Sequence, residues 1–331
     1  MIKWLEDAVF YEVYPQSFRD SNGDGIGDIP GITEKLEYIQ ELGCNALWIN
    51  PCFTSPFYDA GYDVEDYYSV APRYGTNEDL KKLFEAAHQR GMHVLLDLVP
   101  GHTAVTHPWF QESMKAEKNE YTDRYVWTDS LYKRMEDVKG IVSVLRGISP
   151  RPASCGVNCF STQPALNYGF ANITDAGWQQ PTDAPGPMAT REELKNIMRF
   201  WLTLGCDGFR VDMAGSLVKN DEDKKETIRL WQDVRAFLNK EFPEAALVSE
   251  WGKPEVALEA GFDMDFYLHF GDTGYMDLFR GDHPYFGGDP ESDISVFAGI
   301  FAKKSGESAG ERHDVYAKRQ SRYGPDLLSA G

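Results

Sequence analysis

The 331-residue sequence lacks four features, each of which would point to a class of protein. Its five cysteines are scattered and odd in number, so they do not form a disulfide framework. Lys and Arg total 33 against 52 Asp and Glu, and they nowhere gather into the basic stripe that nucleic-acid binding needs. No apolar run approaches the ~20 residues of a membrane span, and the N-terminus lacks a signal-peptide segment. We therefore expect a cytoplasmic globular protein without nucleic-acid or membrane partners.

What is present is a repeated pattern of amphipathic helices and short apolar strands. The composition, 42% hydrophobic and 13% aromatic, is ample for a packed core. Helical spacing followed by an apolar strand occurs four times, with helices at 33–42, 76–90, 190–204 and 227–239 and strands at 45–50, 92–99, 207–213 and 246–250. Thr76 with Asp79 and Thr190 with Glu193 are the expected N-terminal caps of the second and third helices. The apolar faces are expected at Leu36, Ile39 and Leu42, at Leu80, Leu83, Phe84 and Ala87, at Leu194, Ile197, Met198 and Trp201, and at Ile228, Trp231, Val234, Phe237 and Leu238. Parallel neighbours require a long crossover, which a helix supplies, so the pattern predicts parallel β-α units.

Two α/β architectures fit such units, a β/α barrel and a doubly wound sheet. No glycine-rich phosphate loop follows the first strand, which removes the best argument for the nucleotide-binding alternative. We predict a TIM-type (β/α)8 barrel that is incomplete, with six convincing strands, the sixth near 262–267, and an uncertain tail at 302–331. The interval 101–165 is rich in Pro, Gly, Ser and charged residues and breaks the rhythm, so we expect an inserted domain between barrel segments 1–100 and 166–331.

Between residues 20 and 28 (DSNGDGIGD), oxygen-bearing side chains alternate around glycines. Such spacing lets a short loop wrap a hard cation such as calcium, in the manner of an EF-hand loop. However, Gly31 stands where an EF-hand has its bidentate Glu, which argues against an EF-hand pair. The same residue types also build ordinary turns, so a turn that binds nothing is the alternative.

The residues that flank this loop carry a family resemblance. Tyr11–Arg19 (YEVYPQSFR), the loop and the following Gly31-Ile32 together resemble the opening of the α-amylase family of glycoside hydrolases, closest to its oligo-1,6-glucosidase and α-glucosidase branch. The resemblance implies a small domain B inserted after the third barrel strand, where 101–165 lies. It also implies a bound Ca²⁺, whose ligands would be Asp20, Asn22, Asp24, Asp28 and the carbonyl of Ile26.

A strand that ends at residue 212 carries the first candidate catalytic residues. Alternation along GFRVD (208–212) places Arg210 and Asp212 on one face near the C-terminal end of the strand. We expect the guanidinium to lower the pKa of the carboxylate and to orient it, as suits a nucleophile, although an ordinary ion pair is the alternative. GFRVD resembles the nucleophile signature of the α-amylase family, which favours the functional interpretation.

Glu250 ends the next strand, beside Trp251. Partial burial there would raise the pKa of Glu250, so that it holds a proton at neutral pH. Together with Asp212 it would form the two carboxyl groups, about 5 Å apart, that retaining glycosidases use. The resemblance to the family implies the same role, because the family places its general acid/base one β-α unit after the nucleophile.

Two further segments imply sugar contacts by resemblance. Asp97–His102 (DLVPGH) resembles the family's first signature, in which the aspartate supports the site and the histidine, here His102, bonds a sugar hydroxyl; Gly101 replaces the usual Asn. An isolated His is more often structural, but its position at a strand end favours function. Tyr62 and Asp63 resemble the family's sugar platform, with Tyr62 stacked on the pyranose and Asp63 bonding its hydroxyls. The alternative is a capped aromatic turn.

The family's third carboxylate has only a weak candidate, Asp314, because the segment before it is too polar for a barrel strand.

We predict a retaining α-glycoside hydrolase that acts on malto- or isomalto-oligosaccharides through a glycosyl-enzyme intermediate. Two alternatives stay open: a catalytically silent sugar-binding remnant of the same fold, and a transglycosylase or sugar isomerase of the trehalose synthase type.

Overall fold

The computed structural model describes residues 2–268, 279–280, 285, 294–295 and 298–299. The chain divides into two compact units, one formed by Met1–Glu250 with Ala260–Asp263 and the other by Trp251–Glu259 with Met264–Gly331. The second unit contains α8 (Pro254–Glu259) and β10 (Met264–Asp265), and β10 lies inside the range expected for the sixth strand. The tail 302–331, with Asp314, lies outside the described residues.

A parallel sheet forms the centre of the first unit. Its neighbouring strands pair in parallel, in the order β1 (Phe10–Val13), β2 (Ala46–Ile49), β5 (His93–Leu98), β8 (Gly208–Val211) and β9 (Ala246–Ser249). Every residue of β8 and β9 is buried, as expected for strands covered on both faces. Spatial order equals chain order, which is the topology of successive β-α units in a barrel.

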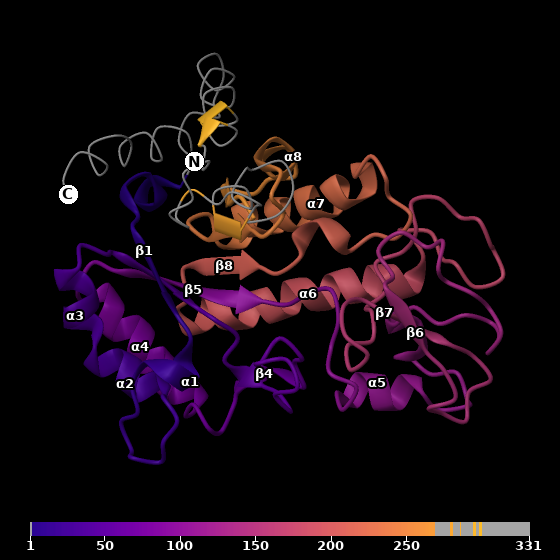
Figure 1. Cartoon of the computed structure of the whole chain (residues 1–331), viewed down its shortest axis with the longest axis horizontal. Helices are drawn as coiled ribbons and strands as arrows, with labels where there is room; N and C mark the ends of the chain where they lie inside the picture. Colours follow the sequence, from indigo (N-terminus) through magenta and orange to yellow (C-terminus); the bar gives the residue numbers. More distant parts are fainter. Residues whose placement is uncertain (1, 269–278, 281–284, 286–293, 296–297, 300–331) are drawn as a thin grey trace. The chain divides into compact units, whose positions relative to one another are not determined.

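Helices supply the crossovers between these strands. They are α2 (Ile29–Glu34) and α3 (Leu36–Glu41), then α4 (Asn77–His88), α6 (Pro185–Leu204) and α7 (Lys225–Glu241). Figure 1 shows α2, α3 and α4 grouped on one side and the long α6 running beside β5 and β8. The apolar faces predicted for three of them are buried: Leu80, Leu83, Phe84 and Ala87 of α4, Leu194, Ile197, Met198 and Trp201 of α6, and Ile228, Trp231, Val234, Phe237 and Leu238 of α7.

The helix boundaries agree with the sequence-based expectation at α4 and differ from it at α6 and α3. The capping box of Thr76 and Asp79 is confirmed at the start of α4. In contrast, α6 begins at Pro185 rather than at Thr190, since proline is preorganised for the first helical turn. Thr190 lies inside this helix and its Oγ1 bonds the carbonyl of Gly186 at 3.1 Å. Leu42, expected to face inward, is 54% exposed because α3 ends at Glu41.

The segment between β5 and α6 has structure of its own. It contains α5 (Pro108–Ser113), a 3-10 turn at Thr122–Arg124 and an antiparallel pair, β6 (Ser143–Leu145) with β7 (Cys155–Val157). In Figure 1, α5, β6 and β7 lie beyond the ends toward which the arrows of β5 and β8 point. This arrangement places the segment near the C-terminal edge of the sheet. Its status as a separate domain stays a prediction, because the division into compact units keeps it together with the sheet.

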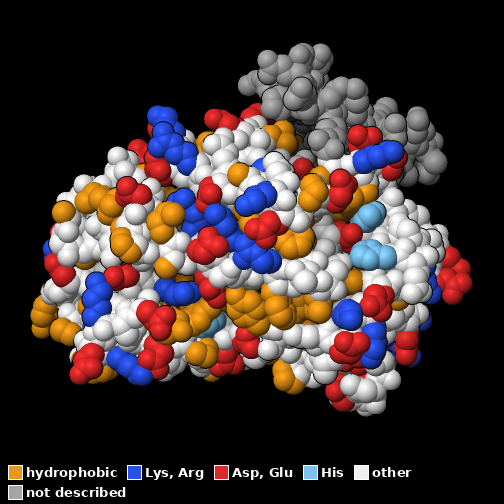
Figure 2. Space-filling view, turned by 180° about the vertical axis from the view of Figure 1, so that it is seen from behind, with side chains coloured by type: hydrophobic (Ala, Val, Ile, Leu, Met, Phe, Trp, Pro, Cys, Tyr) orange, Lys and Arg blue, Asp and Glu red, His pale blue; other side chains and the backbone are white. Residues whose placement is uncertain are grey.

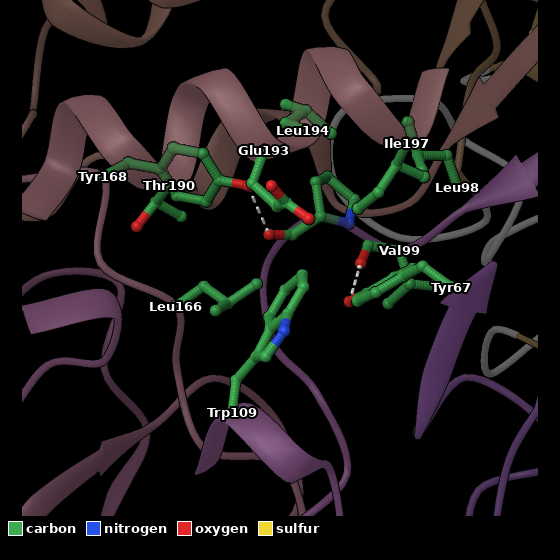
Figure 3. A pocket seen from close by; sticks show the side chains of 11 residues that line it. Tyr67, Leu98, Val99, Trp109, Leu166, Tyr168, Thr190, Glu193, Leu194 and Ile197 are labelled. Atoms are coloured by element: carbon green, nitrogen blue, oxygen red, sulfur yellow. Dashed lines mark hydrogen bonds between the residues drawn. The ribbon is translucent and has the colours of Figure 1, made fainter. Parts of the chain in front are cut away.

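A small cavity marks where this segment packs on the barrel elements. Trp109 of α5 faces the side chains of Glu193 and Leu194 of α6 across it (Figure 3). Tyr168 closes one side through a 2.9 Å hydrogen bond from its hydroxyl to the carbonyl of Pro100. The hydroxyl of Tyr67 likewise bonds the carbonyl of Val99 at 2.8 Å. The Tyr168 contact ties the chain between β5 and α6 to the residues that follow β5, and the Tyr67 contact ties β4 (Asp66–Val70) to them. None of the predicted site residues lines this cavity.

The surface carries charges of both signs in close alternation. On the face shown in Figure 2, Lys and Arg side chains lie next to Asp and Glu side chains rather than forming a continuous basic patch. Across the described part of the chain, every helix is too short or too polar to span a bilayer.

Candidate active site

Three carboxylates converge on one guanidinium at the C-terminal edge of the sheet. The register of β5 and β8 sets Asp97 directly beside Arg210. Arg210 Nη1 lies 2.8 Å from Asp97 Oδ1 and 3.2 Å from Asp212 Oδ1, and its Nη2 lies 2.9 Å from Glu250 Oε2. The structure therefore brings the two predicted catalytic carboxylates together, with Asp97 as the third member of the cluster.

The backbone explains why these side chains meet. Parallel pairing continues one residue past the strand ends, through hydrogen bonds from Asp212 N to Leu98 O (2.8 Å) and from Glu250 N to Val211 O (2.9 Å). Met213 follows in a left-handed conformation, with φ 46° and ψ 40°, which is uncommon for a residue other than glycine. Its backbone N–H donates to Glu250 Oε2 at 3.0 Å. A strained residue here restrains the Glu250 carboxylate beside Asp212.

Two aromatic residues enclose the Arg210 guanidinium. Its central carbon lies 4.9 Å from the centre of the Trp48 ring and 5.9 Å from that of Tyr62. Both aromatics also donate to Asp97 Oδ2, Trp48 through its indole N–H at 2.9 Å and Tyr62 through its hydroxyl at 3.2 Å. Asp97 is thus fully buried and bonded to three side chains, which fixes the guanidinium in turn.

Burial dominates the protonation of this cluster. It raises the pKa of Asp97 to about 6, against the opposing pull of Arg210. Burial is also the largest cause that raises the pKa of Asp212 well above its ordinary value, and the charge of Asp97 adds to it. Arg210 lowers the pKa of Asp212 as expected, but burial and the charge of Asp97 outweigh it, so the expectation of a low pKa for Asp212 is wrong. One guanidinium serves three carboxylates, so its charge does not compensate for all of them.

His102 is buried and both its ring nitrogens have protein partners. Nε2 lies 3.0 Å from the carbonyl oxygen of Tyr62, and Nδ1 lies 3.1 Å from Nδ2 of Asn158. Burial lowers the pKa of His102 to about 4, so the ring is neutral at physiological pH. A direct bond from His102 to a sugar hydroxyl stays a prediction.

Tyr62 borders an open cleft, whereas Asp63 does not. The cleft is lined by Glu12, Tyr14, Asn50, Ala60 and Tyr62. Asn50 donates to the Tyr62 hydroxyl at 3.2 Å, which fixes this ring from the β2 side. Asp63 is fully buried and accepts hydrogen bonds from the Ser55 hydroxyl and from the backbone N–H groups of Tyr58 and Asp59. For Asp63 the structure favours the alternative of a capped turn.

Sequence reasoning missed four residues that support this site. Trp48 and Asn50 lie at the end of β2, so the strand-end argument used for His102 could have found them. Asn158 and Lys219, described below, lie in irregular segments, and no spacing or motif distinguishes them in the sequence.

In the loop 20–28, the oxygen atoms bond backbone amides. Asp20 accepts from the N–H groups of Gly23 (2.7 Å) and Gly25 (2.9 Å), and such bonds lower its pKa. Asp28 caps α2 through Gly31 N and also holds Ser21. Among residues 2–268 and the few described beyond them, no group of three or more His, Cys, Asp or Glu is arranged to hold a metal. The donors are all oxygens, which fits the chemistry of calcium, so calcium stays a prediction.

The family model of the α-amylase catalytic domain matches residues 12–263. The chain belongs to this family. Its match to the trehalose synthase/amylase TreS of Mycolicibacterium smegmatis is 40% identical over 257 residues, covering 75% of this chain and 40% of the relative. An oligo-1,6-glucosidase of Bacillus sp. (strain F5) is 38% identical over 219 residues, covering 66% of this chain and 40% of the relative.

Solved structures agree with the predicted fold. A mutant of the trehalulose synthase MutB superposes with a TM-score of 0.73 at 29% identity, covering 93% of this chain and 56% of that one. Another MutB mutant, in complex with the substrate sucrose, has a TM-score of 0.72 at 30% identity over the same shares. The prediction of an incomplete (β/α)8 barrel of the α-amylase type is confirmed. The chain spans about 40% of the length of the curated relatives that it matches.

Proposed function

We propose that this chain carries the catalytic carboxylates of an enzyme that cleaves α-linked glucosides with retention of the anomeric configuration. The observation that supports this most is the sharing of Arg210 by Asp212 and Glu250 at the ends of β8 and β9. Retaining glycosidases need two carboxyl groups about 5 Å apart. Two carboxylates that bond the same guanidinium lie close together, as this mechanism requires. The oligosaccharide substrate would enter the cleft beside Tyr62, whose ring offers an aromatic face to a pyranose.

In this proposal the two carboxyl groups divide the chemistry. Glu250 donates a proton to the glycosidic oxygen as the bond from the anomeric carbon to that oxygen breaks. Asp212 attacks the anomeric carbon and forms a glycosyl ester. Glu250 then removes a proton from water, which attacks the anomeric carbon, breaks its bond to the Asp212 oxygen and releases Asp212 as a carboxylate. Two inversions give net retention.

The electrostatics of the cluster link the two roles. The charge of Glu250 is one of the causes that raise the pKa of Asp212. A proton on Glu250 therefore removes part of the repulsion that opposes ionisation of Asp212. The first step requires Asp212 to be ionised, and burial opposes this ionisation, so relief of the neighbouring charge acts in the direction that the reaction needs.

Substitution of the proposed nucleophile tests the proposal. We expect Asp212→Asn to lower the hydrolysis of an aryl α-glucoside by a factor of about 10³ or more, since the amide cannot form the ester. Asp233→Asn on α7 is the matched control, because Asp233 is 41% exposed and pairs with Lys195. Equal rates for wild type and Asp212→Asn would refute the assignment.

A second candidate is transfer of the glycosyl group to a sugar acceptor, as the names of several relatives indicate. Trehalose synthases and a trehalulose synthase are among them. The same ester intermediate would serve, with a sugar hydroxyl in place of water. Product analysis with maltose separates the two: free glucose alone supports hydrolysis, and an isomeric disaccharide supports transfer. Binding of maltose without any turnover would support the silent sugar-binding alternative.

We also propose that the loop 20–28 binds calcium, and that the protein is cytoplasmic. For calcium, the support is the oxygen-only donor set of Asp20, Asn22, Asp24, Asp28 and the Ile26 carbonyl. Ion binding would require these oxygens to exchange backbone N–H partners for the metal.

For the location, the support is that all five cysteines are free thiols, which is typical of a reducing compartment. Cell fractionation checks the location.

A further inference from the structure

Gly101 provides space for a side chain from another segment. A Cβ atom built at position 101 would lie 2.6 Å from Nδ2 of Asn158, closer than side-chain carbons approach such atoms. The amide of Asn158 therefore lies against the backbone at the position where the family resemblance leads one to expect an asparagine. The inserted segment between β5 and α6 supplies this amide, directly beside His102.

Hydrogen bonds define the orientation of the Asn158 amide. Nζ of Lys219, a fully buried residue, donates to Asn158 Oδ1 at 3.3 Å and to the carbonyl of Ser216 at 2.8 Å. Burial lowers the pKa of Lys219 to about 7. Below that pH the side chain is an ammonium, which only donates, so the atom that faces Lys219 is the amide oxygen. The amide nitrogen must then face His102, and it donates to Nδ1 at 3.1 Å.

The same reasoning fixes the tautomer of His102. Nδ1 receives a hydrogen bond from an amide N–H, so Nδ1 carries no proton. Nε2 faces the carbonyl oxygen of Tyr62 at 3.0 Å, which only accepts, so Nε2 carries the proton. The chain of donors therefore runs from Lys219 through Asn158 and His102 to the backbone of Tyr62, the residue whose side chain borders the cleft and bonds Asp97.

We propose that Asn158 is a positioning residue, which selects the Nε2–H tautomer of His102 and through it holds Tyr62 in place at the sugar cleft. His102 then acts through Tyr62. The proposal rests on the proposed function only where it assigns Tyr62 a sugar contact; the arrangement of Asn158, His102 and Tyr62 is a statement about the chain by itself.

Nitrogen NMR of the His102 ring tests the proposal without any need for turnover. We expect wild type to show one neutral tautomer, protonated on Nε2. Asn158→Asp replaces the donor by an acceptor, so both ring nitrogens can carry protons, and we expect the pKa of His102 to rise by at least one unit. Asn167→Asp is the matched control: it is a buried asparagine that bonds Asp123 O and Gln180 rather than His102. An unchanged His102 titration in Asn158→Asp would overturn the proposal.

A double-mutant cycle keeps the proposal testable if the buried aspartate prevents folding. Gly101→Ala should displace the Asn158 amide and remove the donor to Nδ1, which raises the pKa of His102, and Asn158→Ala should do the same. The two changes together should have no more effect than Asn158→Ala alone, since the alanine at 101 then meets no amide. An unchanged His102 titration in Asn158→Ala, or fully additive effects, would contradict the assigned role.

Kinetics then connect the arrangement to the sugar. We expect Asn158→Ala to raise KM for an aryl α-glucoside by about tenfold, with a smaller change in kcat, because Tyr62 contacts the sugar in both the bound and the reacting state. A fall confined to kcat would contradict the role of Tyr62. Absence of turnover in wild type would refute the proposed function while the NMR measurements still decide on Asn158.

Discussion

Two acidic regions of the first unit use the same side chains in opposite ways. In the loop 20–28, Asp20 is partly exposed and its oxygens accept backbone N–H groups, which lower its pKa. At the strand ends, Asp97 and Asp212 are buried around Arg210, and burial raises the pKa of both. The comparison shows that hydrogen-bond partners set proton affinity where water is near, and that desolvation sets it where water is excluded.

The largest effect is expected from removal of the shared cation. Arg210→Met leaves three carboxylates without their common guanidinium, and we expect the free energy of unfolding at pH 7 to fall by about 3–5 kcal/mol. The loss should shrink toward pH 4, since the carboxylates then take up protons. Urea unfolding measures it. Arg199→Met, which breaks the surface pair with Glu241, should have little effect. Similar losses for both variants would remove the distinction between buried and exposed acids.

A second prediction concerns the sign of the pH dependence. The pKa of Asp97 is about 6 in the folded protein and near 3.8 when unfolded, so the folded state binds the proton more tightly. Wild type should therefore lose about 2–3 kcal/mol of stability relative to Asp97→Asn as pH rises from about 4 to 7. Urea unfolding of both proteins across this range checks the difference.

Asp207, at the opposite ends of the same strands, provides the control of opposite sign. Burial opposes ionisation there too, but hydrogen bonds with His88 and His93 win, and the pKa of Asp207 is lowered. The stability that Asp207 contributes is thus present above pH 3.8 and is lost as pH falls through its folded pKa. If the difference in free energy of unfolding between wild type and variant changed with pH in the same direction for Asp97→Asn and Asp207→Asn, the assigned causes would be contradicted.

The smallest effect is expected at the loop. If its oxygens bind calcium, millimolar Ca²⁺ should raise the Tm of wild type by about 2–4 °C, and Asp24→Asn should abolish the rise. Differential scanning calorimetry with and without a chelator measures this, with Asp233→Asn as the control. An equal rise with Mg²⁺, or no response to chelation, would favour the simple turn.

Local rules predicted much of the fold. The capping box of Thr76, the buried face of α7 and the strands before Asn50, Val99 and Glu250 follow from spacing alone. The boundary of α6 was misplaced because Thr190 with Glu193 imitates a cap, whereas Pro185 starts the helix. The segment 101–165 gave no periodic signal, since its strands are short and irregularly spaced.

For the site, sequence reasoning named the pair of Asp212 and Glu250, because each ends a strand of a parallel sheet and such ends meet at one edge. Sequence reasoning misjudged the pKa of Asp212, because the segment GFRVD shows only one arginine beside one aspartate. The structure adds Asp97 and Glu250 to the same guanidinium.

The sequence by itself determined the α-amylase architecture, the strand ends that carry acids and the family, because these depend on residues close together in the chain. Only the tertiary structure decided how the charges balance around Arg210, that Asp63 stabilises a turn, and that Asn158 bonds His102. The physical reason is that desolvation and hydrogen-bond partners depend on residues far apart in sequence, such as the 56 positions between His102 and Asn158.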